Sequence, residues 1–153
     1  AWAADDAVMA RAEAALREGL PQAAVAPLTE ALRTAPEADR HALGLLLARA
    51  RLDSGDPQQA LVVLDSTCDR DSADTKLLRA AAFAADGSLE DAATIVAALA
   101  SESPEAAFLL ARIRREQGDP QAALTALSGL DGTLPSDPNS LRLLLDLRLE
   151  TGD

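Results

Sequence analysis

Apolar residues recur at spacings of three and four along most of the chain, in short runs separated by turns that contain glycine and proline. Residues 41–74 show this unit clearly, with apolar positions at Leu43, Leu46, Leu47, Ala50, Ala60, Leu61 and Leu64. Such spacing places the apolar side chains on one face of a helix. Between the two runs, Gly55 can adopt the positive φ that ends a helix, and Pro57 fits the first turn of the next. The stretch therefore predicts a helix, a tight turn and a second helix.

The same pattern predicts helices over most of the chain, separated by similar turns. We expect them at 5–18, 21–34, 38–53, 57–70, 73–86, 89–101, 104–117, 120–130 and 139–150. Only 131–138 has the composition of a linker, and it lies where a boundary between units is expected. The prediction is an all-α chain without a second domain.

The units repeat when they are aligned on the turn glycine. The glycines are Gly19, Gly55, Gly87, Gly118 and Gly152, separated by 36, 32, 31 and 34 residues. Seven residues before the first four stand Ala12, Ala48, Ala80 and Ala111, and five residues after them stand Ala24, Ala60, Ala92 and Ala123. Nine residues after them stand Leu28, Leu64, Val96 and Leu127. Small residues let helices cross closely, and a period of this length is typical of a solenoid.

This pattern resembles the tetratricopeptide repeat family, a 34-residue helical hairpin with an alanine, a large apolar residue four later and a proline at its end. Ala24, Leu28 and Pro36 match that signature, and the resemblance covers about 5–152. The family's tryptophan and tyrosine are absent from the first helices, where the chain has Val8, Gly44, Lys76 and Ala107, then Ala15, Arg51, Phe83 and Arg114.

The resemblance implies one right-handed α-solenoid of stacked helical hairpins over residues 1–153, with about 4.5 repeats. The expected repeats are 5–37, 38–72, 73–103, 104–137 and a half repeat at 138–153.

Charge and composition exclude several classes of function. The chain has 25 acidic and 14 basic residues, for a net charge of -11, which repels nucleic-acid phosphates and anionic lipid heads. Hydrophobic residues make up 48% of the sequence, but no apolar run approaches the ~20 residues that span a bilayer. We therefore expect neither nucleic-acid binding nor membrane insertion.

Residues that carry catalytic or metal chemistry are scarce. The single cysteine, Cys68, cannot form an internal disulfide, and the single histidine, His41, cannot build a zinc site of nitrogen and sulfur ligands alone. Asp69, Asp71 and Asp74 alternate as in a calcium loop, but the required glycine and the distant glutamate are missing. The sequence predicts a non-enzymatic protein without a cofactor or a metal.

In relatives, residues ten, six and three before each turn glycine line the concave groove of the solenoid. The resemblance therefore implies a partner-binding groove at Met9, Glu13, Leu45, Arg49, Leu52, Leu77, Phe108, Arg112 and Arg115. The arginines would meet carboxylates of a partner, and the apolar residues would take apolar side chains. The alternative is that each arginine pairs with a neighbouring acidic residue and that the apolar residues belong to the core.

A scaffold that binds a protein segment explains the repeats and the missing chemistry, and fold resemblance favours bacterial envelope or secretion assembly. A regulatory domain that senses a peptide or small ligand is the alternative. The stretch 1–4, Ala-Trp-Ala-Ala, is similar to the end of an export signal, which would place the protein in the periplasm or otherwise outside the cytoplasm. An ordinary terminus of a cytoplasmic protein explains it equally well.

The last predicted helix is apolar nearly all round, with six leucines between residues 141 and 149. A single helical stripe covers only three or four positions in every two turns, so these leucines cannot all face inward. We expect an interface that includes Leu145 and Leu149. Either the sequence is a fragment of a longer repeat protein, or this helix packs on another copy.

Overall fold

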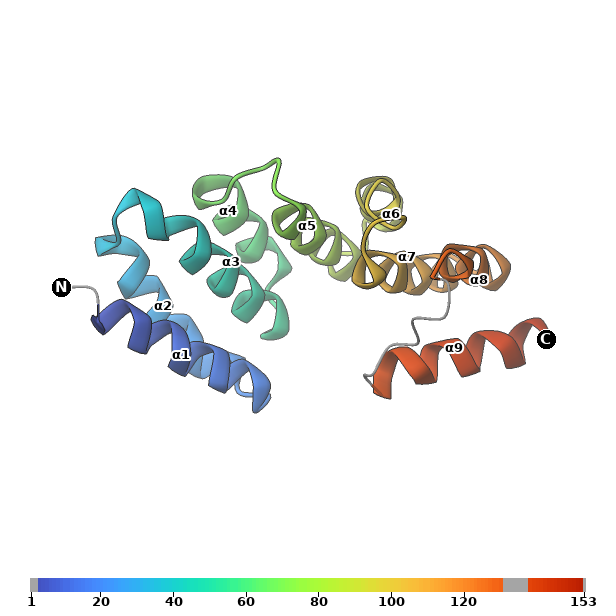
Figure 1. Ribbon diagram of the computed structural model, residues 1–153, viewed down its shortest axis with the longest axis horizontal. Helices are drawn as coiled ribbons and strands as arrows, with labels where there is room; N and C mark the ends of the chain where they lie inside the picture. Colours follow the sequence, from blue (N-terminus) through green and yellow to red (C-terminus); the bar gives the residue numbers. More distant parts are fainter. Residues whose placement is uncertain (1–2, 131–137, 153) are drawn as a thin grey trace. The chain divides into compact units, whose positions relative to one another are not determined.

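The computed structural model describes residues 3–130 and 138–152, and within these ranges every regular element is an α-helix (Figure 1). The helices are α1 (Ala3–Arg17), α2 (Pro21–Thr34), α3 (Glu37–Asp53), α4 (Pro57–Thr67), α5 (Ala73–Ala85), α6 (Leu89–Ala97), α7 (Pro104–Glu116), α8 (Pro120–Ser128) and α9 (Pro138–Thr151). The predicted all-α solenoid of helical hairpins is confirmed. Ala1 and Trp2 of the export-like stretch, and 131–137 of the linker, lie outside the described residues.

The hairpin turns have the backbone geometry that the repeat predicts. All five turn glycines have positive φ, for example 84° at Gly55 and 82° at Gly118. At the end of α3, the Gly55 amide donates to the Leu52 carbonyl at 3.0 Å and the Asp56 amide to the Arg51 carbonyl at 2.9 Å. This left-handed cap satisfies the last carbonyls of the helix, and residues with a Cβ adopt it only with strain. The turn glycines therefore fix where each first helix ends.

Asp56 and Asp119 begin the second helices that follow two of these turns. Asp56 Oδ1 accepts from the Gln59 amide at 3.2 Å, and Asp119 Oδ1 accepts from the Ala122 amide at 2.8 Å. Each aspartate satisfies an amide that the helix leaves without a carbonyl partner. Proline follows at the first helical position, where no amide hydrogen is needed. One short sequence thus ends one helix and starts the next.

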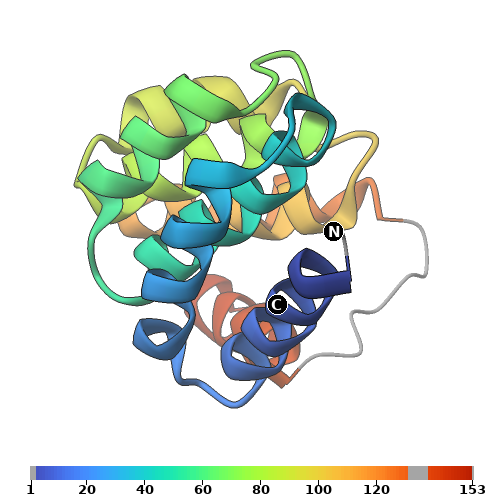
Figure 2. The same cartoon turned by 90° about the vertical axis from the view of Figure 1, so that its left-hand side faces the viewer.

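The contacts divide the chain into two compact units, Ala1–Asp86 and Gly87–Asp153, and the single solenoid over 1–153 stays a prediction. In the first unit, α1 packs against α2 and α3 against α4, while α3 also contacts α1, α2 and α5 (Figures 1 and 2). The core of this unit includes Leu28, Leu43, Leu47 and Leu64, all buried. Helix α3 therefore contacts both of the other first helices of this unit, α1 and α5.

In the second unit, α7 packs against α6, α8 and α9. Its core joins Ala107, Phe108, Ala111, Ala123, Leu127, Leu143 and Leu147. The four alanines that stand five residues after the turn glycines are buried, as predicted: Ala24, Ala60, Ala92 and Ala123.

Two predicted helix ends differ from the structure by three residues or more. Helix α4 ends at Thr67 rather than at residue 70, because Cys68 turns to extended backbone and the Asp69 amide donates to His41 Nδ1 at 3.1 Å. Helix α6 ends at Ala97 rather than at residue 101. Single turns follow it instead, such as the turn closed by the hydrogen bond from the Leu99 amide to the Val96 carbonyl. In the first case, a contact with a residue distant in the sequence ends the helix.

We expect Ala60→Leu to destabilise the first unit. Ala60 is fully buried against Ala48, Leu64 and Ala82, so three extra heavy atoms force the helices apart at a cost of about 1–3 kcal/mol. The measurement is the free energy of unfolding in urea. Ala26→Leu, at an exposed position of α2, is the matched control and should change stability by less than about 0.5 kcal/mol. Equal effects of the two changes would contradict the assigned crossing.

Candidate functional site

The predicted groove positions of the first unit lie on α1, α3 and α5, with mixed exposure. Glu13 and Arg49 are exposed, whereas Met9, Leu45, Leu52 and Leu77 are half-buried. Met9 packs against the core of α1–α3, and Leu45 and Leu52 pack against the cluster that contains Ala48 and Ala60. The apolar members therefore serve the core and still present part of their surface to solvent.

Arg49 has an acidic partner on its own helix. Its Nε donates to Asp53 Oδ2 at 2.9 Å, one helical turn further on. Both side chains stand at the surface, where such a pair contributes little to stability and exchanges readily with water. Arg49 is thus paired, but its guanidinium group stays accessible.

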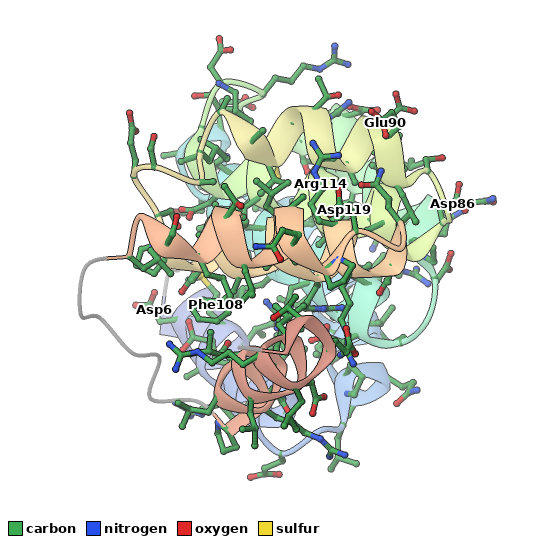
Figure 3. All side chains as sticks on the ribbon, turned by 90° about the vertical axis from the view of Figure 1, so that its right-hand side faces the viewer. Asp6, Asp86, Glu90, Phe108, Arg114 and Asp119 are labelled. Carbon is green, nitrogen blue, oxygen red and sulfur yellow. The ribbon has the colours of Figure 1, made fainter. Side chains whose placement is uncertain are left out.

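In the second unit, the predicted groove positions on α7 differ from each other. Phe108 is buried in the core with Leu143 and Leu147, so little of its ring faces solvent (Figure 3). Arg112 is exposed, and its side chain has no ion pair or hydrogen bond among the described residues. Of these two residues, only Arg112 presents a polar group to solvent.

Arg115 joins α7 to α9. Its Nε donates to both carboxylate oxygens of Glu150, at 2.9 and 3.2 Å, its Nη2 also pairs with Oε1, and its Nη1 lies 3.5 Å from Asp146 Oδ2. The hydrogen bonds to Glu150, with the charges of Glu150 and Asp146, raise the pKa of Arg115, so it is charged at every physiological pH. The geometry therefore gives Arg115 an intramolecular role that holds α9 against α7.

The leucines of α9 divide between two faces. Leu143 and Leu147 are buried, whereas Leu141, Leu145 and Leu149 are 43%, 59% and 72% exposed. The three exposed leucines stand four residues apart and therefore form one stripe along the helix. We call Leu141, Leu145 and Leu149 the leucine stripe. The expectation that the six leucines cannot all face inward is confirmed.

At some positions of the family's tryptophan and tyrosine, this chain has residues whose contacts differ from those of an aromatic ring. At Gly44, an added Cβ would lie 2.9 Å from Cys68 Sγ and closer still to Thr67 Oγ1, so the end of α4 occupies the space of the missing ring. Arg51 Nη1 lies 3.8 Å from Asp56 Oδ2, and Arg114 Nη1 donates to Gln117 Oε1 at 3.0 Å. Gln117 in turn donates to Glu90 Oε2 at 2.8 Å; Arg114 and Glu90 are labelled in Figure 3. Arg51 and Arg114 thus each contact a residue at the turn that follows their own helix.

His41, Cys68 and the neighbouring aspartates have local structural roles. His41 Nδ1 accepts from the Asp69 amide, and Asp69 Oδ1 accepts from the Asp71 amide at 3.0 Å. Burial raises the pKa of the Cys68 thiol, which favours the unreactive protonated form, although its hydrogen bond with Thr67 opposes this. Among the described residues, no three His, Cys, Asp or Glu side chains gather as a metal site would require.

Sequence reasoning did not identify the acidic partners of Arg115, and it did not single out Arg148 beside the leucine stripe. Arg142, on the other side of the stripe, stands ten residues before Gly152, in the register of the predicted groove. The sequence does contain a signal for the contacts of Arg115. Asp146 and Glu150 stand six and two residues before Gly152, and Arg115 stands three residues before Gly118, so the three residues hold similar positions in their repeats. First helices of successive repeats that pack together bring such residues side by side. Opposite charges at matching repeat positions therefore predict this type of pair.

A family model described as tetratricopeptide repeat matches residues 45–104 and 94–140. No curated protein and no solved structure matches the chain. Within the described part of the chain, no helix is both long and apolar enough to cross a membrane.

We expect Arg115→Gln to loosen α9. Loss of the charged contacts with Glu150 and Asp146 should speed hydrogen exchange at the amides of 142–150 by roughly two- to fivefold, a modest factor because the pair is exposed. Arg112→Gln, one turn earlier on the same helix, removes a guanidinium group that has no partner in the described part of the chain, and it should leave this exchange unchanged. Identical exchange in the two variants would show that Arg115 does not restrain α9.

We expect Gly44→Ala to be destabilising, although alanine is the better helix former by about 1 kcal/mol. The added methyl group meets Cys68 Sγ and Thr67 Oγ1, and overpacking of this kind costs about 1–3 kcal/mol. The free energy of unfolding measures the net effect. Gly129→Ala is the control, since Gly129 has a φ of -77° and an added Cβ there would meet nothing within 4 Å. A stabilising Gly44→Ala would mean that α4 does not close on Gly44.

Proposed function

The chain belongs to the tetratricopeptide repeat family, and we propose that it is a non-enzymatic scaffold that binds a protein segment along the first helices of its hairpins. Repeats of this family generally mediate protein–protein interaction, and the family is typically a non-enzymatic scaffold. The proposed binding positions are the predicted groove residues of α1, α3 and α5 in the first unit and Arg112 of α7 in the second.

The observation that supports this proposal most directly is the exposure of Arg49 and Arg112 on first helices of a chain with a net charge of -11. Arg112 has no acidic partner among the described residues, and Arg49 pairs only at the surface with Asp53. A carboxylate of a partner can accept two parallel hydrogen bonds from such a guanidinium group. The sites therefore favour a segment that carries acidic side chains.

Half-buried apolar residues near Arg49 complete the proposed surface of the first unit. Leu45 precedes Arg49 by one turn and Leu52 follows it by nearly one, and both keep part of their side chains in solvent. Since both are held in place by the core, a partner side chain that covers them gains apolar contact without ordering them anew. The preferred segment has apolar residues beside its acidic ones.

Two predicted groove residues take other roles in this proposal. Arg115 positions α9 through Glu150 and Asp146, so its guanidinium group is not offered to a partner. Phe108 supports the core beneath the surface.

We further propose that the scaffold works in bacterial envelope or secretion assembly, as an exported protein. The support is the resemblance to scaffolds of that type and the export-like composition of residues 1–4.

A displayed peptide library provides a defined ligand for the test. We expect selected peptides to combine acidic and apolar residues, and the double variant Arg49→Glu with Arg112→Glu to weaken their binding at least about tenfold in calorimetry, since repulsion replaces charge-assisted hydrogen bonds. Binding to the unmodified chain should also weaken as salt increases.

The control is Arg17→Glu with Arg33→Glu, which changes the net charge equally. Arg33 pairs with Glu30 on the second helix α2, as Arg49 pairs with Asp53 on α3, and Arg17 is exposed like Arg112. We expect this variant to bind within about twofold of the original chain, because long-range charge effects alone are screened by salt. An equal loss of peptide affinity in the two double variants would contradict binding at Arg49 and Arg112.

A further inference from the structure

The leucine stripe of α9 occupies the face that a second helix covers in the hairpins that begin with α1, α3 and α7. Relative to the turn glycine, Leu145 corresponds to Ala12 of α1, Ala48 of α3 and Ala111 of α7. Those alanines are 2%, 1% and 0% exposed, and each lies in a helix that packs against the second helix of its own hairpin. The stripe is therefore a helix-docking face that no described helix covers.

The residue at this position determines which kind of helix fits. Alanine lets the axes of two helices approach closely, and the separation grows with the size of the side chains at the contact. Leu145 replaces that alanine, and Leu141 and Leu149 stand one turn to either side. A face of three leucines suits a wider, leucine-to-leucine contact rather than the alanine crossing of these hairpins.

Charged side chains flank the stripe. Arg142 and Arg148 each stand three residues from Leu145, which places them about 60° to either side of it on the helix. Both are exposed, and neither side chain has an ion pair or a hydrogen bond among the described residues. Asp146 lies on the same side of the stripe as Arg142 and is partly exposed beside Arg115. This edge of α9 thus carries one cation and one anion.

We propose that the leucine stripe docks on the leucine stripe of a second copy of this chain, with the two α9 helices antiparallel and Leu145 at the two-fold axis. In this register, Leu141 faces Leu149 of the other copy. Arg142 lies at the level of residue 148 of the other copy, so the other copy's Asp146 is about 3 Å away along the axis, on the same edge. Two symmetric pairs between Arg142 and Asp146 therefore fix the antiparallel direction.

The strength of this contact follows from its size and charge. Three leucines from each copy form a smaller interface than the roughly 1,200–2,000 Å² of stable complexes. Each copy also has a net charge of -11, which opposes the approach of another. The association is therefore weak and concentration-dependent.

Sedimentation velocity of the chain over increasing concentration tests the interface. The average mass should rise toward that of a dimer, and Leu145→Glu should keep the chain monomeric over the same range. Val62→Glu is the matched control, because Val62 is 57% exposed on α4, a helix of the other compact unit. The Val62→Glu variant should dimerise as the unmodified chain does. Circular dichroism should show unchanged folding of both variants, since both sites are exposed.

Disulfide trapping tests the antiparallel register, with Cys68→Ser as the background. Leu145→Cys should form a symmetric disulfide rapidly, whereas Leu149→Cys should not, because its two copies lie about 12 Å apart along the axis. A mixture of Leu141→Cys and Leu149→Cys should cross-link to a heterodimer. Arg142→Asp should weaken dimerisation several-fold, while Arg148→Asp, with no acidic residue opposite, should not.

A chain that stays monomeric at every accessible concentration would overturn the proposal. So would a dimer that persists with Leu145→Glu, since another surface would then carry it. Rapid trapping of Leu149→Cys with itself would overturn the antiparallel register. None of these results depends on the proposed binding of a protein segment, which is measured at Arg49 and Arg112.

Discussion

The close crossing of two helices at a pair of buried alanines is the contact on which the hairpins of α1 with α2, α3 with α4 and α7 with α8 depend. Ala48 of α3 and Ala60 of α4 lie in one core cluster, and Ala111 and Ala123 repeat the arrangement in α7 and α8. The crossing requires that both helices start and end at fixed residues, which the left-handed glycine and the following N-cap ensure. With both helices so close, the larger residues Leu64 and Leu127 fill the remaining space. Local turn geometry and long-range packing therefore support the same arrangement.

Much of the fold could be predicted because its determinants are local and repeated. The glycine φ, the proline at the first helical position and the apolar spacing each act within a few residues, so the sequence contains them directly. The end of α4 could not be predicted in the same way. It depends on the hydrogen bond that the Asp69 amide donates to His41, 28 residues earlier. It also depends on Gly44, which has no side chain and therefore leaves space for Thr67 and Cys68. Such contacts follow from packing and not from periodicity.

The same distinction between local determinants and contacts of distant residues applies to the candidate site. The pair of Arg49 with Asp53 can be read from the sequence, since residues four apart meet on a helix surface. The partners of Arg115 come from a neighbouring helix, 31 and 35 residues later, so its role requires the packing of α7 on α9. Phe108 likewise becomes a core residue only because Leu143 and Leu147 pack in the same cluster. Register predicts which residues share a face, but the neighbouring helix decides which of them remain accessible.

Salt should affect the two proposed surfaces differently, because their charges act over different distances. A segment bound at Arg49 and Arg112 relies on attraction at exposed sites, which added salt weakens. Association of two copies meets the repulsion of net charges of -11 spread over each molecule, mostly beyond the Debye length of about 8 Å at physiological ionic strength. Salt screens that repulsion more than it weakens apolar contact between leucines or a pair in direct contact such as Arg142 with Asp146. Moderate salt should therefore weaken the first interaction and favour the second, which separates the two surfaces without any change to the chain.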